Sequence, residues 1–239
     1  MKDELDDPRR EFLVKLLTLG ALTSGGMSFS NLAQAMGKIP KVLPPGKSFF
    51  DINGQVLVNK KTATLDTFIK PGDTIETGPS SRAIFVIGKD AFHMRADSSL
   101  KVDGSAIINT LRLFSGKVLS VFGHRQNQKL SLHTSTATIG VRGTGVYMET
   151  DPEKSYVCTC YGLTDISSSV NRNFKTTVLS KHHDAPKYIL TDEHKGNLIV
   201  PAPMINHTDQ ELILIESLVG REPPFGIEGD LYQGPRKDY

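Results

Sequence analysis

The sequence of 239 residues predicts an all-β protein with many short, mostly antiparallel strands, rolled into a sandwich or barrel-like sheet, and one short C-terminal helix. Three observations support this class. Apolar residues recur at every second position in many short segments, which is the period of a strand. Gly, Pro, Asp and Ser clusters separate these segments at the spacing typical of sandwiches and barrels. Between about residues 48 and 205, no segment has a convincing helical period.

Most of the expected strands alternate between apolar and polar residues, as strands with one buried face do. The apolar positions include the pairs Val56 and Val58, Leu100 and Val102, and Leu130 and Leu132. The segment 83–87 is apolar on both faces, so we expect a central strand that is covered on both sides. Turns such as Pro71-Gly72-Asp73, Gly88-Lys89-Asp90 and Ser115-Gly116-Lys117 separate the strands, because these residues favour turn conformations.

One helix is predicted over residues 209–219. Thr208 and Glu211 form a capping box, in which each side chain can accept from a free backbone N–H group of the first turn. Apolar residues then follow at helical spacing, at Leu212, Ile215, Leu218 and Val219. Gly220 stands where a helix commonly ends in a left-handed residue.

Composition and motifs argue against two classes of function. The net charge is +2, and the basic residues are interspersed with acidic ones rather than clustered, so we expect no nucleic-acid binding. The chain contains no G-x-S-x-G or H-E-x-x-H motif, and we therefore expect no enzyme. The glycines of 140–145 do not have the spacing of a phosphate-binding loop, and they predict a bend between strands.

The N-terminus has the features of an export signal. Arg9 and Arg10 precede Phe12 and Leu13, which matches the twin-arginine pattern. The apolar stretch 16–29 follows, and it is too short for a membrane span of roughly 20 residues. Ala33-Gln34-Ala35 then resembles a signal peptidase site. We expect a cleavable signal over 1–35, twin-arginine export machinery as a partner, and a periplasmic mature protein with no stable membrane span; a basic amphipathic helix of a cytosolic protein is the alternative.

The two cysteines of the chain, Cys158 and Cys160, are two positions apart in an expected strand and so share one face. Their Cα atoms would be about 6.6 Å apart, near the upper limit for a disulfide, so a bridge between them would be strained. Same-face thiolates also suit copper or zinc. Three interpretations stay open: a metal or redox site, a strained disulfide, and a pair of small buried or free thiols.

Histidines in expected loops could complete a metal site. Adjacent His182 and His183 would point opposite ways on a strand, so at most one of them would share the cysteine face. Antiparallel pairing of residues 176–181 with 155–160 could bring that histidine close, and His207 is a candidate for the fourth tetrahedral position. His93 is expected on a solvent-facing side of its strand.

The order of three strings in the middle of the chain resembles the FecR family. They are PGDTIETGPSSRA at 71–83, LRLFSGKV at 111–118 and TATIGVRGTGV at 136–146. The resemblance covers about residues 54–168, and it implies the β fold and the periplasmic compartment. FecR proteins are known as periplasmic transducers that relay the state of an outer-membrane receptor to a cytoplasmic sigma factor.

These observations together predict four regions: a signal at 1–35, a linker at 36–50, a FecR-like β domain at 51–200, and a C-terminal helix with a Pro-rich tail at 201–239. We expect a non-catalytic sensory module that binds an unidentified periplasmic ligand or protein partner. The alternative is a periplasmic metal-binding or redox protein that uses Cys158 and Cys160 with a histidine.

Overall fold

The computed structural model describes residues 42–104, 108–125 and 130–225. Within them, fourteen strands form one sheet, and every pairing except that of β8 with β9 is antiparallel. In chain order the elements are β1 (Phe49–Asn53), β2 (Val56–Val58), β3 (Lys61–Thr62), β4 (Thr74–Thr77), β5 (Arg82–Ile87), β6 (Asp90–Met94), β7 (Ser99–Gly104), β8 (Ile108–Val121), β9 (Leu130–His133), β10 (Ala137–Thr150), β11 (Lys154–Ser168), β12 (Lys175–Ser180), β13 (Lys187–His194), β14 (Asn197–Pro201) and α3 (Asp209–Ser217). The all-β class with one short C-terminal helix is confirmed, although the sheet does not close into a barrel.

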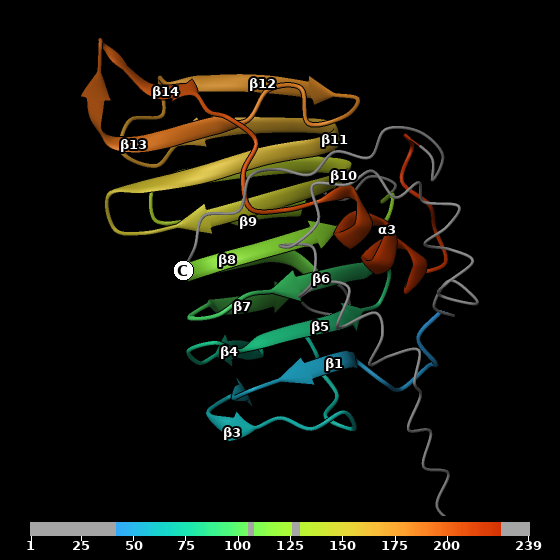
Figure 1. The fold of residues 1–239 in the computed structure, drawn as a ribbon. Helices are drawn as coiled ribbons and strands as arrows, with labels where there is room; N and C mark the ends of the chain where they lie inside the picture. The colour runs from blue at the N-terminus through green and yellow to red at the C-terminus, as the bar shows by residue number, and fades with distance from the viewer. Residues whose placement is uncertain (1–41, 105–107, 126–129, 226–239) are drawn as a thin grey trace, which may run out of the picture.

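The sheet folds into two layers because three long strands, β8, β10 and β11, each pass from one layer to the other (Figure 1). The first layer contains β1, β5, β6, β13 and β14 with the second halves of β8 and β10 and the first half of β11. The second layer contains β2, β3, β4, β7, β9 and β12 with the remaining halves of the long strands. The sequence suggested many short strands, and these three long ones are the exception.

Each long strand changes layer beside a glycine with a left-handed backbone. The φ angles are +82° at Gly116 in β8, +58° at Gly143 in β10 and +88° at Gly162 in β11. A side chain does not fit at the first of these glycines, since a Cβ on Gly116 would lie 2.5 Å from Ser98 Cα. The bend expected in 140–145 is confirmed, but it lies inside one continuous strand, with a register shift between Arg142 and Gly145.

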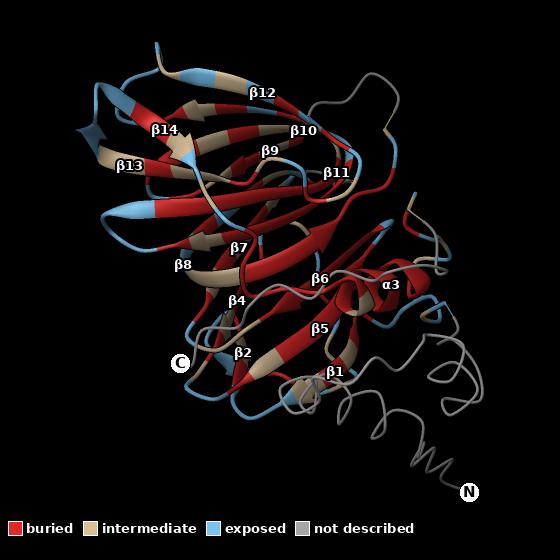
Figure 2. Ribbon diagram, turned by 45° about the horizontal axis from the view of Figure 1, so that its top comes forward, coloured by how far each residue is buried: buried red, intermediate tan, exposed pale blue. Residues whose placement is uncertain are grey.

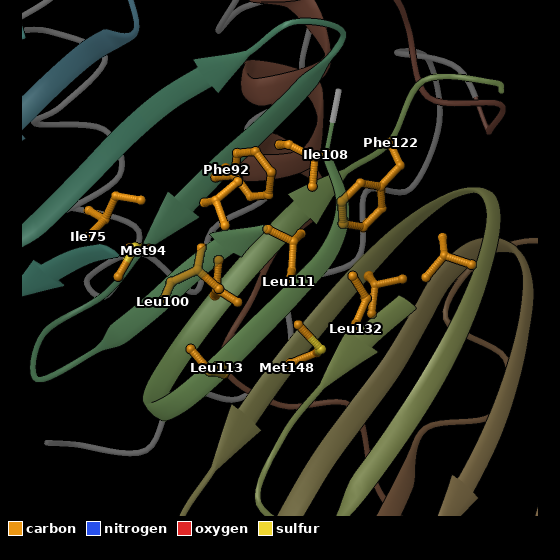
Figure 3. Packing of buried hydrophobic residues seen from close by; sticks show 14 of the residues in the cluster. Ile75, Phe92, Met94, Leu100, Ile108, Leu111, Leu113, Phe122, Leu132 and Met148 are labelled. Carbon is orange, nitrogen blue, oxygen red and sulfur yellow. The ribbon is translucent and has the colours of Figure 1, made fainter. Parts of the chain in front are cut away.

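An apolar core fills the space between the layers (Figure 3). Phe85 and Phe92 stack there with ring centroids 5.0 Å apart, and Leu111, Leu132 and Met148 pack from the long strands and β9. Figure 2 shows buried residues continuing through the middle strands of both layers. The expectation that 83–87 is covered on both sides is confirmed, because Ala83, Ile84 and Phe85 are fully buried.

A second apolar cluster lies on the outer side of the first layer, and the C-terminal segment (residues 202–221) covers it. Strand residues such as Ile84, Leu119 and Tyr147 contribute to this cluster from the sheet, and Leu212 and Ile215 contribute from α3. Cys158 and Cys160 belong to the same cluster. The C-terminal segment therefore lies directly over the cysteine face.

The predicted capping box starts α3: Thr208 accepts from the backbone of Glu211, and the Glu211 carboxylate accepts from the backbone of Thr208. The helix ends at Ser217, two residues before the expected end, and Gly220 follows with φ +71°. Eight of its nine residues are buried, including Asp209, Glu211 and Glu216. The helix is therefore enclosed on nearly all sides, whereas the sequence suggested a single apolar face.

The expected signal at 1–35, with Arg9 and Arg10, lies outside the described residues. Within the described part of the chain, no helix has the length and apolar character that crossing a membrane requires.

Candidate metal centre

Cys158 and Cys160 point outward from the first layer because they alternate along β11 with Val157, which packs in the core between the layers. Neither side chain has any exposed surface, and the two thiols are not bonded to each other. Cys158 pairs with Tyr147 of β10, so the cysteine face continues across the layer as an aromatic surface.

The loop after β12 supplies His183. This residue has a φ of +56°, and its backbone N–H donates to the carbonyl of Cys160 at 2.9 Å. The side chain of Asp184 closes the loop by accepting from the backbone of Lys181 at 2.6 Å. The expected strand pairing is wrong in register: β12 pairs with residues 162–167 of β11 rather than with 155–160. His183 reaches the cysteines because it lies just beyond that ladder, where the chain leaves β12.

His207 comes from the C-terminal segment, two residues before α3 begins. It has no exposed surface and stacks on Tyr147, with ring centroids 4.4 Å apart. The preceding residue, Asn206, has a φ of +63°, donates to Glu149 and accepts from Arg95 through its carbonyl. These contacts, from β10 and from the residue just after β6, set the direction in which His207 enters the cysteine face.

The four residues Cys158, Cys160, His183 and His207 form a compact group, which we call the Cys/His cluster. One ligand atom from each lies within 4.8 Å of those of the others. The Nε2 atom of His207 is 3.2 Å from Nδ1 of His183 and 3.5 Å from Sγ of Cys160, and Sγ of Cys158 is 3.4 Å from Nδ1 of His183.

These separations are close to those of a tetrahedral metal site. Zinc binds sulfur at about 2.3 Å and nitrogen at about 2.0–2.1 Å, so tetrahedral angles would place two nitrogens about 3.3 Å apart and a sulfur and a nitrogen about 3.6 Å apart. These three separations differ from the tetrahedral values by about 0.2 Å or less. Two sulfur and two nitrogen donors around one point suit zinc.

Hydrogen bonds outside the cluster orient both imidazoles. His207 Nδ1 lies 2.7 Å from the carbonyl of Ile205, which can only accept, so Nδ1 carries the proton and Nε2 faces the cluster. His183 Nε2 lies 3.0 Å from Oδ1 of the buried Asp209, which leaves Nδ1 toward the cluster. Carboxylate and carbonyl partners of this kind are usual behind metal-bound histidines.

The electrostatics of the cluster favour one thiolate in the absence of a cation. Burial raises the pKa of Cys158, but hydrogen bonds with Cys160 and the two imidazoles outweigh it and bring that pKa well below its ordinary value. Burial and the neighbouring Cys158 hold the pKa of Cys160 well above its ordinary value. Burial lowers the pKa of His183, but Asp209 and Cys158 outweigh it and raise this pKa to about 9. A cation that binds both sulfurs would displace the remaining protons.

The same residues contain a second chemical arrangement, a thiol, an imidazole and a carboxylate in series, at Cys158, His183 and Asp209. Such a series activates the nucleophile of cysteine hydrolases. Cys158, however, is fully buried beneath the C-terminal segment, and Cys160 and His207 complete a four-donor set around it. The geometry therefore fits a closed metal site better than a nucleophile that must reach a substrate.

The structure brings together four of the five residues that the sequence suggested as ligands. His182 lies outside the Cys/His cluster. Its Nε2 atom is 2.9 Å from the carboxylate of Asp209, and its ring stacks on Phe225. Of the adjacent pair, only His183 reaches the cysteine face, as expected. Sequence reasoning missed Asp209, although its place in the first turn of a helix just after His207 was a usable signal.

The expectation for His93 is wrong. It lies on the outer side of β6, as alternation suggested, but only 2% of its surface is exposed. Helix α3 covers that side of the strand, and His93 Nδ1 is 3.7 Å from the carboxylate of Glu211.

The three glycines at the layer crossings and the two cysteines all lie between residues 73 and 162. Residues 73–162 match the model of the family described as FecR protein. This FecR region is less than half of the chain, and it includes Cys158 and Cys160. His183 and His207 lie beyond it. Half of the donors in the Cys/His cluster therefore come from outside the matched region.

Among solved structures, the chain is similar to two crystal structures of a putative anti-sigma factor from Parabacteroides distasonis. Each has 10% sequence identity and a TM-score of 0.44, and the match covers 54% of this chain. The chain spans 58% of the length of these solved structures. A comparison with curated protein sequences found no match.

Proposed function

We propose that this chain is a metal-binding sensory module of the periplasm, in which Cys158, Cys160, His183 and His207 bind one zinc ion. The observation that carries the proposal is the set of four buried donors within 4.8 Å of one another, three of whose separations are close to tetrahedral values. Two thiolates and two imidazoles also bind copper, which makes copper the competing metal.

The role of the bound metal follows from the completeness of the donor set. Four protein ligands fill a tetrahedron and leave no position for water or substrate, as in structural rather than catalytic zinc sites. The cysteines supply the negative charge that a divalent cation requires in a buried place. Ile205 and Asp209 hold the imidazoles in the tautomers that can bind. The chain's own contribution is thus to position and desolvate the cation.

A regulatory rather than catalytic role is supported by the match of residues 73–162 to the FecR model. The resemblance of the sequence to FecR proteins implies a periplasmic module that responds to a signal, and the twin-arginine pattern at Arg9 and Arg10 supports the same compartment. In this proposal, the metal is the ligand that the module binds.

Metal analysis of the protein exported by its own signal tests the proposal. Tag-free protein purified from the periplasmic fraction should contain one equivalent of zinc or copper per chain. The variant Cys158→Ser/Cys160→Ser should lose the metal, because serine is a poor ligand for these cations. His194→Ala is the matched control, since His194 is exposed on the hairpin of β13 and β14, and it should keep the metal.

Thiol titration of denatured, metal-free wild-type protein completes the test. Two free thiols without added reductant are expected. No bound metal together with no free thiols would indicate a disulfide and overturn the proposal. Absence of the chain from the periplasmic fraction would contradict the proposed location.

A further inference from the structure

We infer that the metal locks the C-terminal segment (residues 202–221) onto the first layer of the sheet, so that metal binding and docking of α3 are one coupled equilibrium. This inference rests on the proposed function, because it assigns a regulatory consequence to the same four ligands.

The origin of the ligands is the first argument. Cys158 and Cys160 belong to β11, and His183 belongs to the loop after β12, whereas His207 belongs to the C-terminal segment. Asp209, the first residue of α3, also accepts from His183. The segment therefore supplies one ligand and orients another, and a metal bound by all four residues cross-links it to the sheet.

Further polar contacts of the segment include ion pairs and hydrogen bonds, some to the rest of the protein and one, between Glu216 and Arg221, within the segment. Glu211 accepts from Arg95 at 2.8 Å, and Glu216 pairs with Tyr161 and with Arg221. Removing charges from water offsets most of the attraction within such pairs, so they specify a position more than they stabilise it. The metal would therefore add, to the apolar burial of α3, a stabilisation of docking that these polar pairs do not supply.

The helix itself depends on docking. It has nine residues, and isolated helices of this length are marginal in water. Its apolar residues Leu212 and Ile215 are fully buried against the sheet. Release of the segment would therefore unfold α3, and exchange of its backbone amides would report the release directly.

Coupling of this kind acts in both directions. Metal binding requires His207 to be in place, and His207 is in place only while the segment is docked. A substitution that weakens docking without touching a ligand should therefore weaken metal binding as well.

Hydrogen–deuterium exchange of the full chain tests the lock. Removing the metal with a chelator should accelerate exchange of amides in 209–217 about tenfold or more, and leave β7 in the second layer unchanged, because β7 does not contact the segment. In the reciprocal arm, Leu212→Ala should lower zinc affinity about tenfold. Leu100→Ala is the matched control, because Leu100 is equally buried but lies between the layers, and it should leave the affinity unchanged.

The outcomes separate the two proposals. Stoichiometric zinc with exchange in 209–217 that does not depend on the metal would overturn the lock and leave the metal site standing. Wild-type protein that binds no metal would overturn both. Because the exchange measurement uses wild-type protein, it decides the lock even where a variant fails to fold.

Discussion

Asp209 shows how one buried carboxylate can tune the whole cluster. It has no exposed surface and accepts from both His182 and His183. The sequence places Asp209 in the first turn of a helix just after His207, but no pattern pairs it with His183, because the two residues are 26 positions apart and come from different elements. The same-face arrangement of Cys158 and Cys160 was predictable, since it depends only on the period of a strand.

We predict that Asp209→Asn lowers zinc affinity about tenfold to a hundredfold while all four ligands stay in place. The amide has the same shape but lacks the charge that supports His183 as a ligand. Competition with a chromophoric chelator measures the affinity, and Asp192→Asn in the exposed part of β13 is the control. Equal affinities for the two variants would show that Asp209 has no part in positioning the ligand.

At the scale of single elements, each long strand depends on a glycine where it passes from one layer to the other. Gly116 has a φ of +82°, and an added Cβ would lie 2.5 Å from Ser98 Cα and 2.7 Å from the carbonyl oxygen of Asp97. The sequence placed this glycine in a turn after a strand. It could not indicate that the strand continues through it, because the continuation is stabilised by β6 and β10, which pair with residues 116–121.

We predict that Gly116→Ala destabilises the protein by about 3 kcal/mol, combining the strain of a left-handed alanine with overpacking against backbone. Gly196→Ala is the matched control: its φ is +75°, but nothing lies within 4 Å of the added Cβ. The control should cost about 1 kcal/mol from strain alone. Urea unfolding with unchanged m-values measures both, and equal costs would contradict the assigned crossing.

The start of α3 was predictable because a capping box is a local pattern. Its burial on nearly all sides was not. Asp209, Glu211 and Glu216 lie outside the apolar positions that the sequence indicated, and each is buried beside an ion-pair partner from another segment or from just after the helix. The misplaced expectation for His93 has the same cause, since α3 covers a strand face that alternation alone would leave in water.

The sequence predicted the all-β class at the scale of the whole molecule, because alternation and turn residues recur along most of the chain. It did not predict two layers joined by long strands, since that arrangement depends on pairings between distant segments. The sequence also suggested all four residues of the Cys/His cluster as ligands. Only the fold shows that β11, the loop after β12 and the C-terminal segment meet at this cluster.

X-ray absorption spectroscopy of the zinc-loaded protein tests the central claim most directly, because it reports the atoms bound to the metal. We predict two sulfur neighbours at about 2.3 Å and two nitrogen neighbours at about 2.0–2.1 Å, with no further oxygen. In Cys160→Ser the sulfur number should fall to one. A zinc spectrum with only nitrogen and oxygen neighbours would contradict the claim that the Cys/His cluster is the metal site.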